Sequence, residues 1–196
     1  MAERTHIVPI LPRWHASQDV LLKALVANGG ELYSAMESVE GQVGDDGGVP
    51  TTLQLRYSRI TDEGVEALAG LTEVTEFESS MRMTDAALAH MRGMSKMERL
   101  TFNEMSVAGD GLRHLAGMSR LESLQLCGCA LTDDALAHLP ALPGLAMLNL
   151  TGSSGCTDAW LGCLTRLKGL TAFCLNGAPA VGPGLRHLAA LPRLTS

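Results

Sequence analysis

A column of histidines and one cysteine recurs along the chain, and these side chains are common metal ligands. Immediately before a helical leucine stand, in order, Ala67, His90, His114, His138, Cys163 and His187. A closed zinc site needs four ligands at about 2.0–2.3 Å. Adjacent helices pack about 8–10 Å apart, so at most two members of the column can reach one ion. We therefore expect no metal and no cofactor, and we interpret the column as histidines on the surface or the helix flank. A metal ladder and a pH sensor remain as alternatives.

Four Thr-Asp pairs recur at a similar spacing and suggest catalysis or metal binding at first sight. They are Thr61-Asp62, Thr84-Asp85, Thr132-Asp133 and Thr157-Asp158. Each pair precedes a predicted helix, where threonine is a good N-cap and aspartate suits the helix dipole. We therefore predict that these residues cap helices. The sequence also contains no phosphate-binding loop, nucleophile elbow, His-Glu-x-x-His motif or Asp-rich calcium loop, so we predict that the protein is not an enzyme.

The elements that position these residues repeat at a nearly constant period. One column aligns Leu53, Phe77, Leu100, Leu124, Leu148 and Phe173, at steps of 24, 23, 24, 24 and 25 residues. Such a period indicates a solenoid, in which each unit buries its apolar face against its neighbours. In the unit over 121–144, the alternation around Gln125 predicts a short strand. Apolar residues at steps of three, Leu136, Leu139, Leu142 and Leu145, then predict a helix with one inward face.

The pattern Leu-x-x-Leu-x-Leu, a turn, Ile-Thr-Asp and Leu-x-x-Leu-x-x-Leu resembles the leucine-rich repeat family over residues 50–196. Residues 60–65 are similar to the "ITD-x-G-L" form of bacterial repeat proteins and of the cysteine-containing class. The resemblance implies an α/β solenoid, curved and right-handed, with parallel strands on the concave face and short helices on the convex face. The usual asparagine after the strand is absent, and Ser58, Met105 and Cys129 stand in its place. Two units depart, at 107–110 and 180–183, and the second predicts an irregular helix start.

The repeat pattern divides the chain into two parts. Residues 1–49 do not repeat, and we interpret them as an N-terminal capping segment with a helix over 17–28, a second helix or extended segment over 31–43 and a glycine-rich loop over 41–48. Residues 50–196 form an array of about six units. After Leu194 only two residues follow. We therefore expect the last repeat to be uncapped, with end-on self-association, fraying or truncation as the alternatives.

Composition limits the class of partner. The 196 residues carry a formal charge of −6, and residues 31–78 alone hold eleven acidic side chains against two arginines. This balance argues against nucleic acid, because phosphate binding needs a basic surface. The acidic region is either a solvated face or an electrostatic footprint for a basic partner. No window has the ~18 apolar residues of a membrane span. Five cysteines without framework spacing suggest free thiols and a cytoplasmic location.

We therefore expect a non-catalytic module that binds a protein or an extended peptide on the concave strand face. Amides and hydroxyls on this face suit hydrogen bonding to a partner's backbone, and its charges suit orientation of the partner. The alternative is an accessory or substrate-recognition subunit of an enzyme complex, such as a GTPase activator or a ligase substrate receptor. The predicted partner-binding residues are Gln54, Arg56, Tyr57, Glu76, Glu78, Arg99, Thr101, Asn103, Gln125, Asn149, Thr151 and Asn176.

Overall fold

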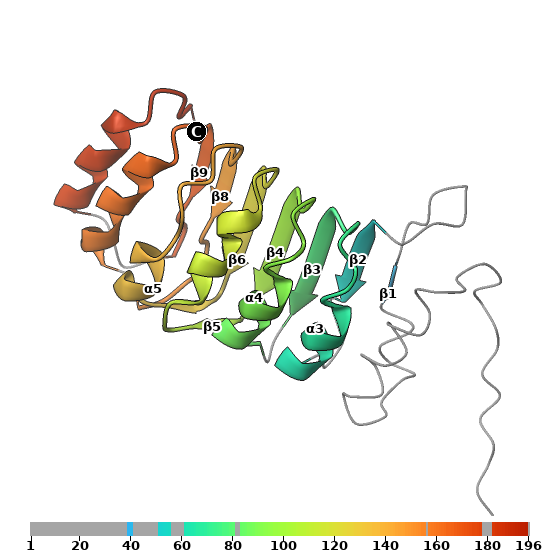
Figure 1. Ribbon diagram of the computed structural model, residues 1–196. Helices are drawn as coiled ribbons and strands as arrows, with labels where there is room; N and C mark the ends of the chain where they lie inside the picture. The colour runs from blue at the N-terminus through green and yellow to red at the C-terminus, as the bar shows by residue number, and fades with distance from the viewer. Residues whose placement is uncertain are drawn as a thin grey trace, which may run out of the picture.

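The computed structural model describes residues 39–40, 51–55, 61–80, 83–155, 157–177 and 182–195. Within them the chain forms a sheet backed by short helices (Figure 1). The predicted helix over 17–28, the glycine-rich loop over 41–48 and the predicted binding residues Arg56 and Tyr57 lie outside these ranges.

Six parallel strands follow one another across the sheet, in the order of the repeats. They are β2 (Thr52–Leu55), β3 (Glu76–Ser80), β4 (Arg99–Asn103), β6 (Ser123–Cys127), β8 (Met147–Asn149) and β9 (Ala172–Cys174). Each residue of the column that begins at Leu53 lies opposite its counterpart on the next strand, as far as Phe173. The periodic column is therefore one row of neighbours, and the predicted parallel solenoid is confirmed.

The N-terminal edge of the sheet carries one further strand. β1 (Val39–Glu40) pairs with β2 in the antiparallel direction, with Val39 opposite Leu55. It comes from the segment for which the sequence predicts either an extended conformation or a second helix. A small second sheet, β5 (Ser106–Val107) and β7 (Ala130–Leu131), lies just beyond the C-terminal ends of β4 and β6.

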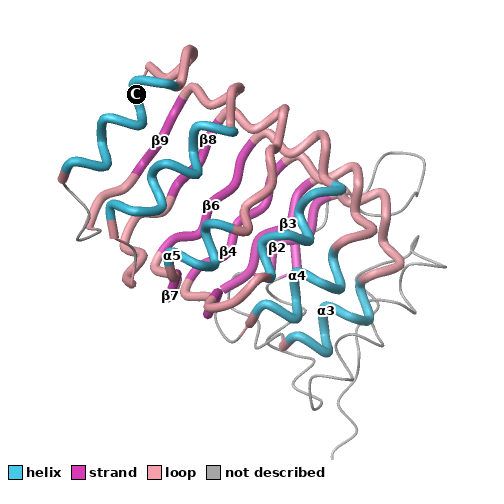
Figure 2. The backbone as a smooth tube through the Cα atoms, turned by 60° about the vertical axis from the view of Figure 1, so that its left-hand side comes forward, coloured by secondary structure: helices cyan, strands magenta, loops and turns pink. Residues whose placement is uncertain are grey.

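Short helices cover one face of the sheet (Figures 1 and 2). Three are α-helices: α3 (Asp62–Leu68), α4 (Asp85–Met91) and α5 (Asp133–Ala137). Three are 3-10 helices: η1 (Gly111–Gly117), η2 (Asp158–Arg166) and η3 (Pro183–Ala190). A 3-10 helix has three residues per turn, so apolar side chains three apart share one face. Leu112, Leu115 and Met118 show this spacing at η1, and all three are buried.

The prediction of one helical face from Leu136 to Leu145 is wrong in its extent. α5 ends at Ala137, three residues before Pro140. Proline lacks the N–H that continues a helix and also disfavours the helical conformation of the residue before it. Leu139, Leu142 and Leu145 therefore lie in the turns that follow, yet all three are buried. Apolar spacing predicted their burial but not their secondary structure.

The core lies between the sheet and the helices and is mainly aliphatic. Two side chains at equivalent positions of successive repeats, Cys129 and Ser153, tie one repeat to the one before. Ser153 Oγ donates a hydrogen bond to the Leu126 carbonyl at 2.6 Å, and Cys129 Sγ contacts the Phe102 carbonyl at 3.7 Å.

Ser79 is the buried serine that lacks such a bond. It is 1% exposed in a column that elsewhere contains Leu55, Phe102, Leu126 and Leu150, and its hydroxyl has no hydrogen-bond partner. An unpaired buried hydroxyl costs about 1–3 kcal/mol. We predict that Ser79→Ala raises the free energy of unfolding by about 1 kcal/mol in urea denaturation. Ser153→Ala is the matched control and should lower it by a similar amount, because its hydroxyl is bonded. Equal losses from both substitutions would contradict the assignment.

Candidate functional site

The predicted binding residues lie on the face of the sheet opposite the helices, which we call the strand face. Along β4, exposed Arg99 and half-buried Thr101 and Asn103 alternate with buried Leu100 and Phe102. The pairing register aligns the outward residues in columns. The first holds Thr52, Glu76, Arg99, Ser123, Met147 and Ala172, the second holds Gln54, Glu78, Thr101, Gln125, Asn149 and Cys174, and the third begins with Ser80, Asn103 and Cys127.

The third column continues beyond the strands. Thr151 follows β8 and is half-buried, and Asn176 follows β9 and is exposed. The Asn149 side chain accepts a hydrogen bond from the Thr151 N–H at 2.9 Å, which fixes the amide at the end of its strand. The structure thus brings nine of the twelve predicted residues to one face. The side chain of Gln54 and the residues Arg56 and Tyr57 lie outside what the structure describes.

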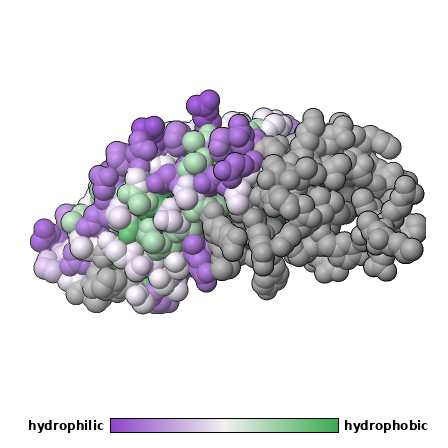
Figure 3. Space-filling view, turned by 90° about the horizontal axis from the view of Figure 1, so that it is seen from below, coloured by the Kyte–Doolittle hydropathy of each residue, from purple (hydrophilic) through white to green (hydrophobic). Residues whose placement is uncertain are grey.

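Polar side chains dominate the described surface. Met147 at 39% and Leu185 at 41% are its exposed large hydrophobic residues, and only Met147 lies on the strand face. Seen from below, the coloured residues in Figure 3 are hydrophilic along their upper edge, with a few hydrophobic residues between them. The strand face therefore offers hydrogen bonds and charge, with few apolar anchors in its described part.

Charge is confined to the N-terminal half of the strand face. Arg99 Nη2 donates to Glu76 Oε1 at 2.5 Å, and this hydrogen bond raises the pKa of Arg99. Glu98 and Glu122 act on the same guanidinium over a longer range. Beyond β6 the outward residues of the strands are uncharged.

Two cysteines on and beside the strand face are poor nucleophiles. Burial raises the pKa of Cys129 to about 11, and burial also raises the pKa of the Cys127 thiol. The nucleophile in thiol chemistry is the thiolate, which a raised pKa makes scarce at neutral pH. Neither side chain has the surroundings of an activated cysteine.

The Thr-Asp pairs cap helices as predicted, with one exception. The hydroxyls of Thr84, Thr132 and Thr157 accept hydrogen bonds from backbone N–H groups in the first turns of α4, α5 and η2. Thr61 makes no such cap, and its hydroxyl donates to Glu63 Oε2 at 2.6 Å. That bond lowers the pKa of Glu63.

The aspartates of these pairs have a second task that the sequence did not reveal. Asp133 accepts the N–H of Thr157 at 2.7 Å and its hydroxyl at 2.5 Å, one repeat further on. Asp62 binds Thr84 in the same way, at 2.9 and 2.6 Å. Each of these aspartates therefore fixes the N-cap of the next helix, which explains why threonine and aspartate recur together.

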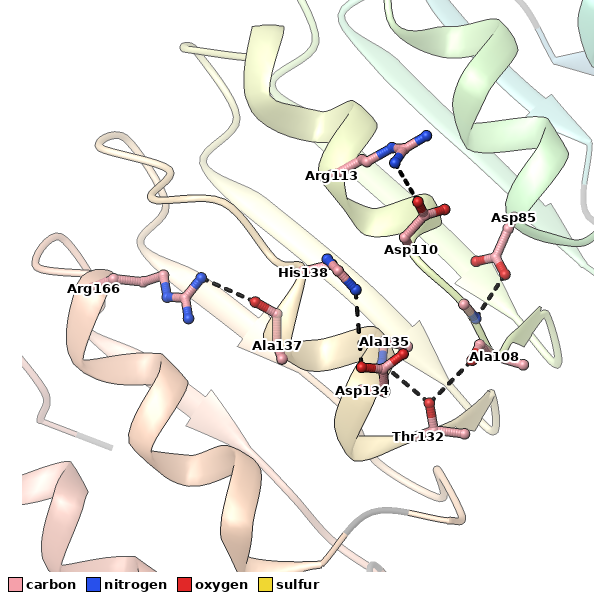
Figure 4. A network of polar contacts seen from close by, with 11 residues as sticks. Asp85, Ala108, Asp110, Arg113, Thr132, Asp134, Ala135, Ala137, His138 and Arg166 are labelled. Carbon is pink, nitrogen blue, oxygen red and sulfur yellow. Dashed lines mark hydrogen bonds and ion pairs between the residues drawn. The ribbon is translucent and has the colours of Figure 1, made fainter.

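In the two departing repeats the aspartate of the preceding repeat meets backbone and glycine instead of threonine, and its Oδ1 has no hydrogen-bond partner. Figure 4 shows the first of these contacts, at Asp85. Asp85 Oδ2 accepts the Gly109 N–H at 2.8 Å, and a Cβ on Gly111 would overlap the carboxylate. Asp158 Oδ2 accepts only a long hydrogen bond, from the Gly184 N–H at 3.4 Å, and a Cβ on Gly182 or on Gly184 would overlap Asp158. Neither η1 nor η3 has a side-chain cap, which confirms the predicted irregular start of the last helix. Glycine, which has no Cβ, therefore lets the carboxylate of the aspartate one repeat earlier approach the backbone.

The histidine column lies on the helix side of the molecule. His90, His114 and His187 are half-buried and His138 is exposed, with its Nε2 3.9 Å from Asp134 Oδ1. Within the described ranges, no three His, Cys, Asp or Glu side chains are grouped so that they could hold a metal ion. The absence of a metal remains a prediction, and the geometry is that of separate residues on neighbouring helices.

Within the described ranges, Glu104 is the non-glycine residue that has a positive φ. It follows β4 with φ of 61°, the left-handed region, where Gly128, Gly152 and Gly177 occupy the equivalent places in later repeats. Glutamate pays a conformational cost there that glycine does not. Its side chain is exposed.

The aspartate network makes a specific prediction about stability. Asp133→Ala removes both bonds to Thr157 and should lower the free energy of unfolding by about 1.5 kcal/mol, since hydrogen bonds to charged groups are worth about 1.5–3 kcal/mol. Amide exchange at Thr157 should become faster. Asp134→Ala is the matched control on the adjacent exposed residue and should change stability by less than about 0.5 kcal/mol. Equal effects of the two substitutions would show that helix-dipole charge, and not the bond to the next repeat, matters.

Comparison with known proteins bears on the fold. Residues 51–69 match the family model described as Leucine Rich repeat. No curated protein matches the sequence significantly. None of the helices in the described part of the chain is long and apolar enough to cross a bilayer.

Several solved structures are similar to the chain. An internalin (inlF) from Listeria monocytogenes strain 4b F2365 superposes with a TM-score of 0.53 and 20% identity, over 74% of this chain and 46% of that one. A TDR receptor gives a TM-score of 0.43 and 16% identity, over 66% and 27%. The ectodomain of the Arabidopsis thaliana receptor kinase GASSHO1/SCHENGEN3 gives 0.28 and 14%, over 66% and 24%.

Of these three superpositions, that of the internalin exceeds a TM-score of 0.5, and at 20% identity it shows a shared fold alone. This chain spans less than half the length of the internalin chain. The repeated apolar column, the parallel sheet with its short helices, the match over residues 51–69 and the internalin superposition together show that the chain has a leucine-rich repeat fold.

Proposed function

We propose that this protein is a non-catalytic interaction module that binds another protein, or an extended peptide, on its strand face. The observation that carries the proposal is the register of the sheet. It aligns outward polar residues in continuous columns on the face that the described helices leave uncovered. Leucine-rich repeat domains generally mediate protein–protein interaction, which agrees with this proposal.

The chemistry of the columns suits a partner's backbone. Gln125 and Asn149 lie opposite each other on β6 and β8, and both are half-buried. An amide both donates and accepts hydrogen bonds, so such a pair can bind the N–H and C=O groups of an extended segment. Six strands about 4.8 Å apart give a surface roughly 25 Å long. Few apolar anchors are available, so a single contact of this kind should be weak unless several act together.

A comparison of two sets of substitutions tests the face. Partners captured from the native host are identified by mass spectrometry, and the chain is then tested with five strand-face residues replaced by alanine. A matched set replaces five exposed residues on the helix side. The strand set is Glu78, Asn103, Gln125, Asn149 and Asn176, and the helix set is Glu66, Arg92, Arg113, Asp134 and Arg186. We expect the strand set to weaken capture at least tenfold, because it removes the polar groups available to the partner.

The helix set should leave capture unchanged, and both variants should keep the circular dichroism of the wild type. Loss of capture by the helix set, with the strand set unaffected, would place the binding site on the other face. If the wild type captures no specific protein, the proposal of an interaction module is wrong.

The C-terminal end of the described sheet carries partly exposed apolar side chains. Leu185 is 41% exposed, and Leu188, Leu194 and Phe173 pack only in part against the core. Their counterparts one repeat earlier, including Leu161 and Leu164, are buried. β9 pairs only with β8 within the described sheet, while the Thr195 N–H reaches the Thr171 carbonyl at 2.9 Å, as the next strand would begin.

End-on self-association through this region stays a prediction. We expect light scattering to show a mass that rises with protein concentration, because association would bury the exposed leucines and the open strand edge. Leu185→Lys should abolish the rise by placing like charges in the contact. A constant monomer mass over the whole concentration range, with slow amide exchange through Leu194, would contradict the prediction.

A further inference from the structure

We propose that the repeat array contains a hinge between its third and fourth repeats, where the helix side opens and closes about the paired strands β4 and β6. The third repeat contains β4 and η1, and the fourth contains β6 and α5. Movement at this hinge changes the curvature of the strand face, because the helices lie on the opposite side of the sheet (Figure 2). Its use in partner binding rests on the proposed function, whereas the hinge itself does not.

The strand side of this junction is held firmly. β4 and β6 pair along their whole length, from Arg99 opposite Ser123 to Asn103 opposite Cys127. They make the most extensive contact of any neighbouring strands in the described sheet. The second sheet, formed by β5 and β7, joins the same two repeats. The spacing of the strands is therefore fixed at this junction, and the strands can serve as the axis of a rotation.

The helix side of the same junction is held loosely. Of the neighbouring helices that the structure describes, η1 and α5 have the least contact with each other. One cause is the length of α5, which ends at Ala137, before Pro140. His138 follows α5 and is exposed, whereas the other three histidines of the column are half-buried. The ring of His187, for example, lies against Gly162 of the preceding helix. The exposure of His138 agrees with a loose contact between α5 and η1.

The sequence explains why this junction lacks a charged connection. Asp62 and Asp133 each hold the capping threonine one repeat further on. In the third repeat Gly109 stands at the position of these aspartates, so Thr132 has no carboxylate from the preceding repeat to bind. Its hydroxyl donates to the Ala108 carbonyl at 3.3 Å instead (Figure 4). A hydrogen bond between neutral groups is about half as strong as one to a charged group.

No other charged side chain replaces the missing connection. Asp110 is next to Gly109, but its carboxylate pairs with Arg113 of the same repeat. Asp134 Oδ1 lies 3.9 Å from His138 Nε2, also within one repeat. The structure describes all residues from 83 to 155, and among them no charged side chain connects η1 to α5. The neutral bond of the capping threonine is therefore the side-chain hydrogen bond between these two helix starts.

The repeats on either side of the junction are linked more firmly. Arg166 Nη1 donates to the carbonyls of Ala137 and Leu139, at 3.1 and 2.8 Å, so the fifth repeat holds the C-terminal end of α5. η2 and η3 have the most contact of all neighbouring helices that the structure describes. On the other side, Asp85 Oδ2 accepts the Gly109 N–H at 2.8 Å and connects the second repeat to the third. The described array thus consists of two stiffer groups of three repeats.

Buried side chains limit the movement to a small rotation. Leu115 of η1 and Leu136 of α5 are both buried in the core. A wide opening of the helices would expose such side chains to water and lose their hydrophobic stabilisation. Because the strands stay about 4.8 Å apart, a wider spacing of the helices makes the strand face more concave. The hinge therefore adjusts the curvature of the face without breaking the sheet.

Distances between spin labels on the helix side test the hinge in the free protein. One label pair replaces Ala86 and Asp134 and spans the junction. The control pair replaces Ala137 and Arg186 in the C-terminal group, and all four residues are exposed. The labels are attached through a genetically encoded ketone residue, which leaves the native cysteines in place. We expect double electron–electron resonance to give a distance distribution about twice as wide for the first pair, because the loosely held helices move relative to each other.

Two variants with opposite expected effects test the cause. Ala108→Thr/Gly109→Asp restores the Thr-Asp pair and should narrow the distribution of the first label pair, because it supplies the carboxylate that Thr132 lacks. Asp133→Ala removes the bonds to Thr157 and should broaden the distribution of the control pair. Circular dichroism establishes that each variant is folded before its distances are measured.

Two results would overturn the inference. Equal widths for the two label pairs, in the protein without further substitutions, would show that this junction is no looser than the others. An unchanged width in folded Ala108→Thr/Gly109→Asp would refute the missing aspartate as the cause. If that variant does not fold, an unchanged control width in Asp133→Ala refutes the same cause. None of these results involves a partner, so they are distinct from a failure of the proposed function, which the capture experiment tests.

Discussion

The whole structure depends on each repeat being held in register against the one before it. A single row of carbonyls shows this constraint: each accepts two N–H groups from the next repeat, as the Glu98 carbonyl does from Glu122 and Ser123. The same arrangement recurs at Thr75, Glu122 and Ala146. A shift of one residue would turn every leucine toward solvent. The same alignment of the repeats therefore buries the apolar column and forms the backbone hydrogen bonds between strands.

Side chains reinforce this alignment on both sides of the core. Beneath the strands, Ser153 and Cys129 reach back to the carbonyls of the preceding repeat. At the helix starts, Asp62 and Asp133 hold the capping threonine of the following one. In the two repeats that lack this threonine, glycine lets the carboxylate approach the backbone instead. The connections differ in chemistry from repeat to repeat but each joins nearest neighbours, as expected for a solenoid.

Register also creates the surface on which function is proposed. Because side chains alternate along a strand, the alignment that buries one set of residues arranges the other set in columns. The residues in those columns are then displayed at about 4.8 Å spacing. Glu104, in a left-handed conformation where later repeats have glycine, is a local cost on the same side. Unfavourable features of this kind often lie at functional surfaces.

The sequence by itself determined the fold, the strand register and the assignment of outward and buried residues, because a period near 24 and an alternation of two leave one way to bury the leucines. It also predicted four threonine caps, of which three form and that of Thr61 does not. Only the tertiary structure decided the rest. α5 stops before Pro140 although the leucine spacing continues, and the bonds of Asp133 to Thr157 and of Glu98 to Glu122 join residues 24 apart. Such contacts are set by how neighbouring repeats stack, and local sequence patterns carry no information about the distance across a stack.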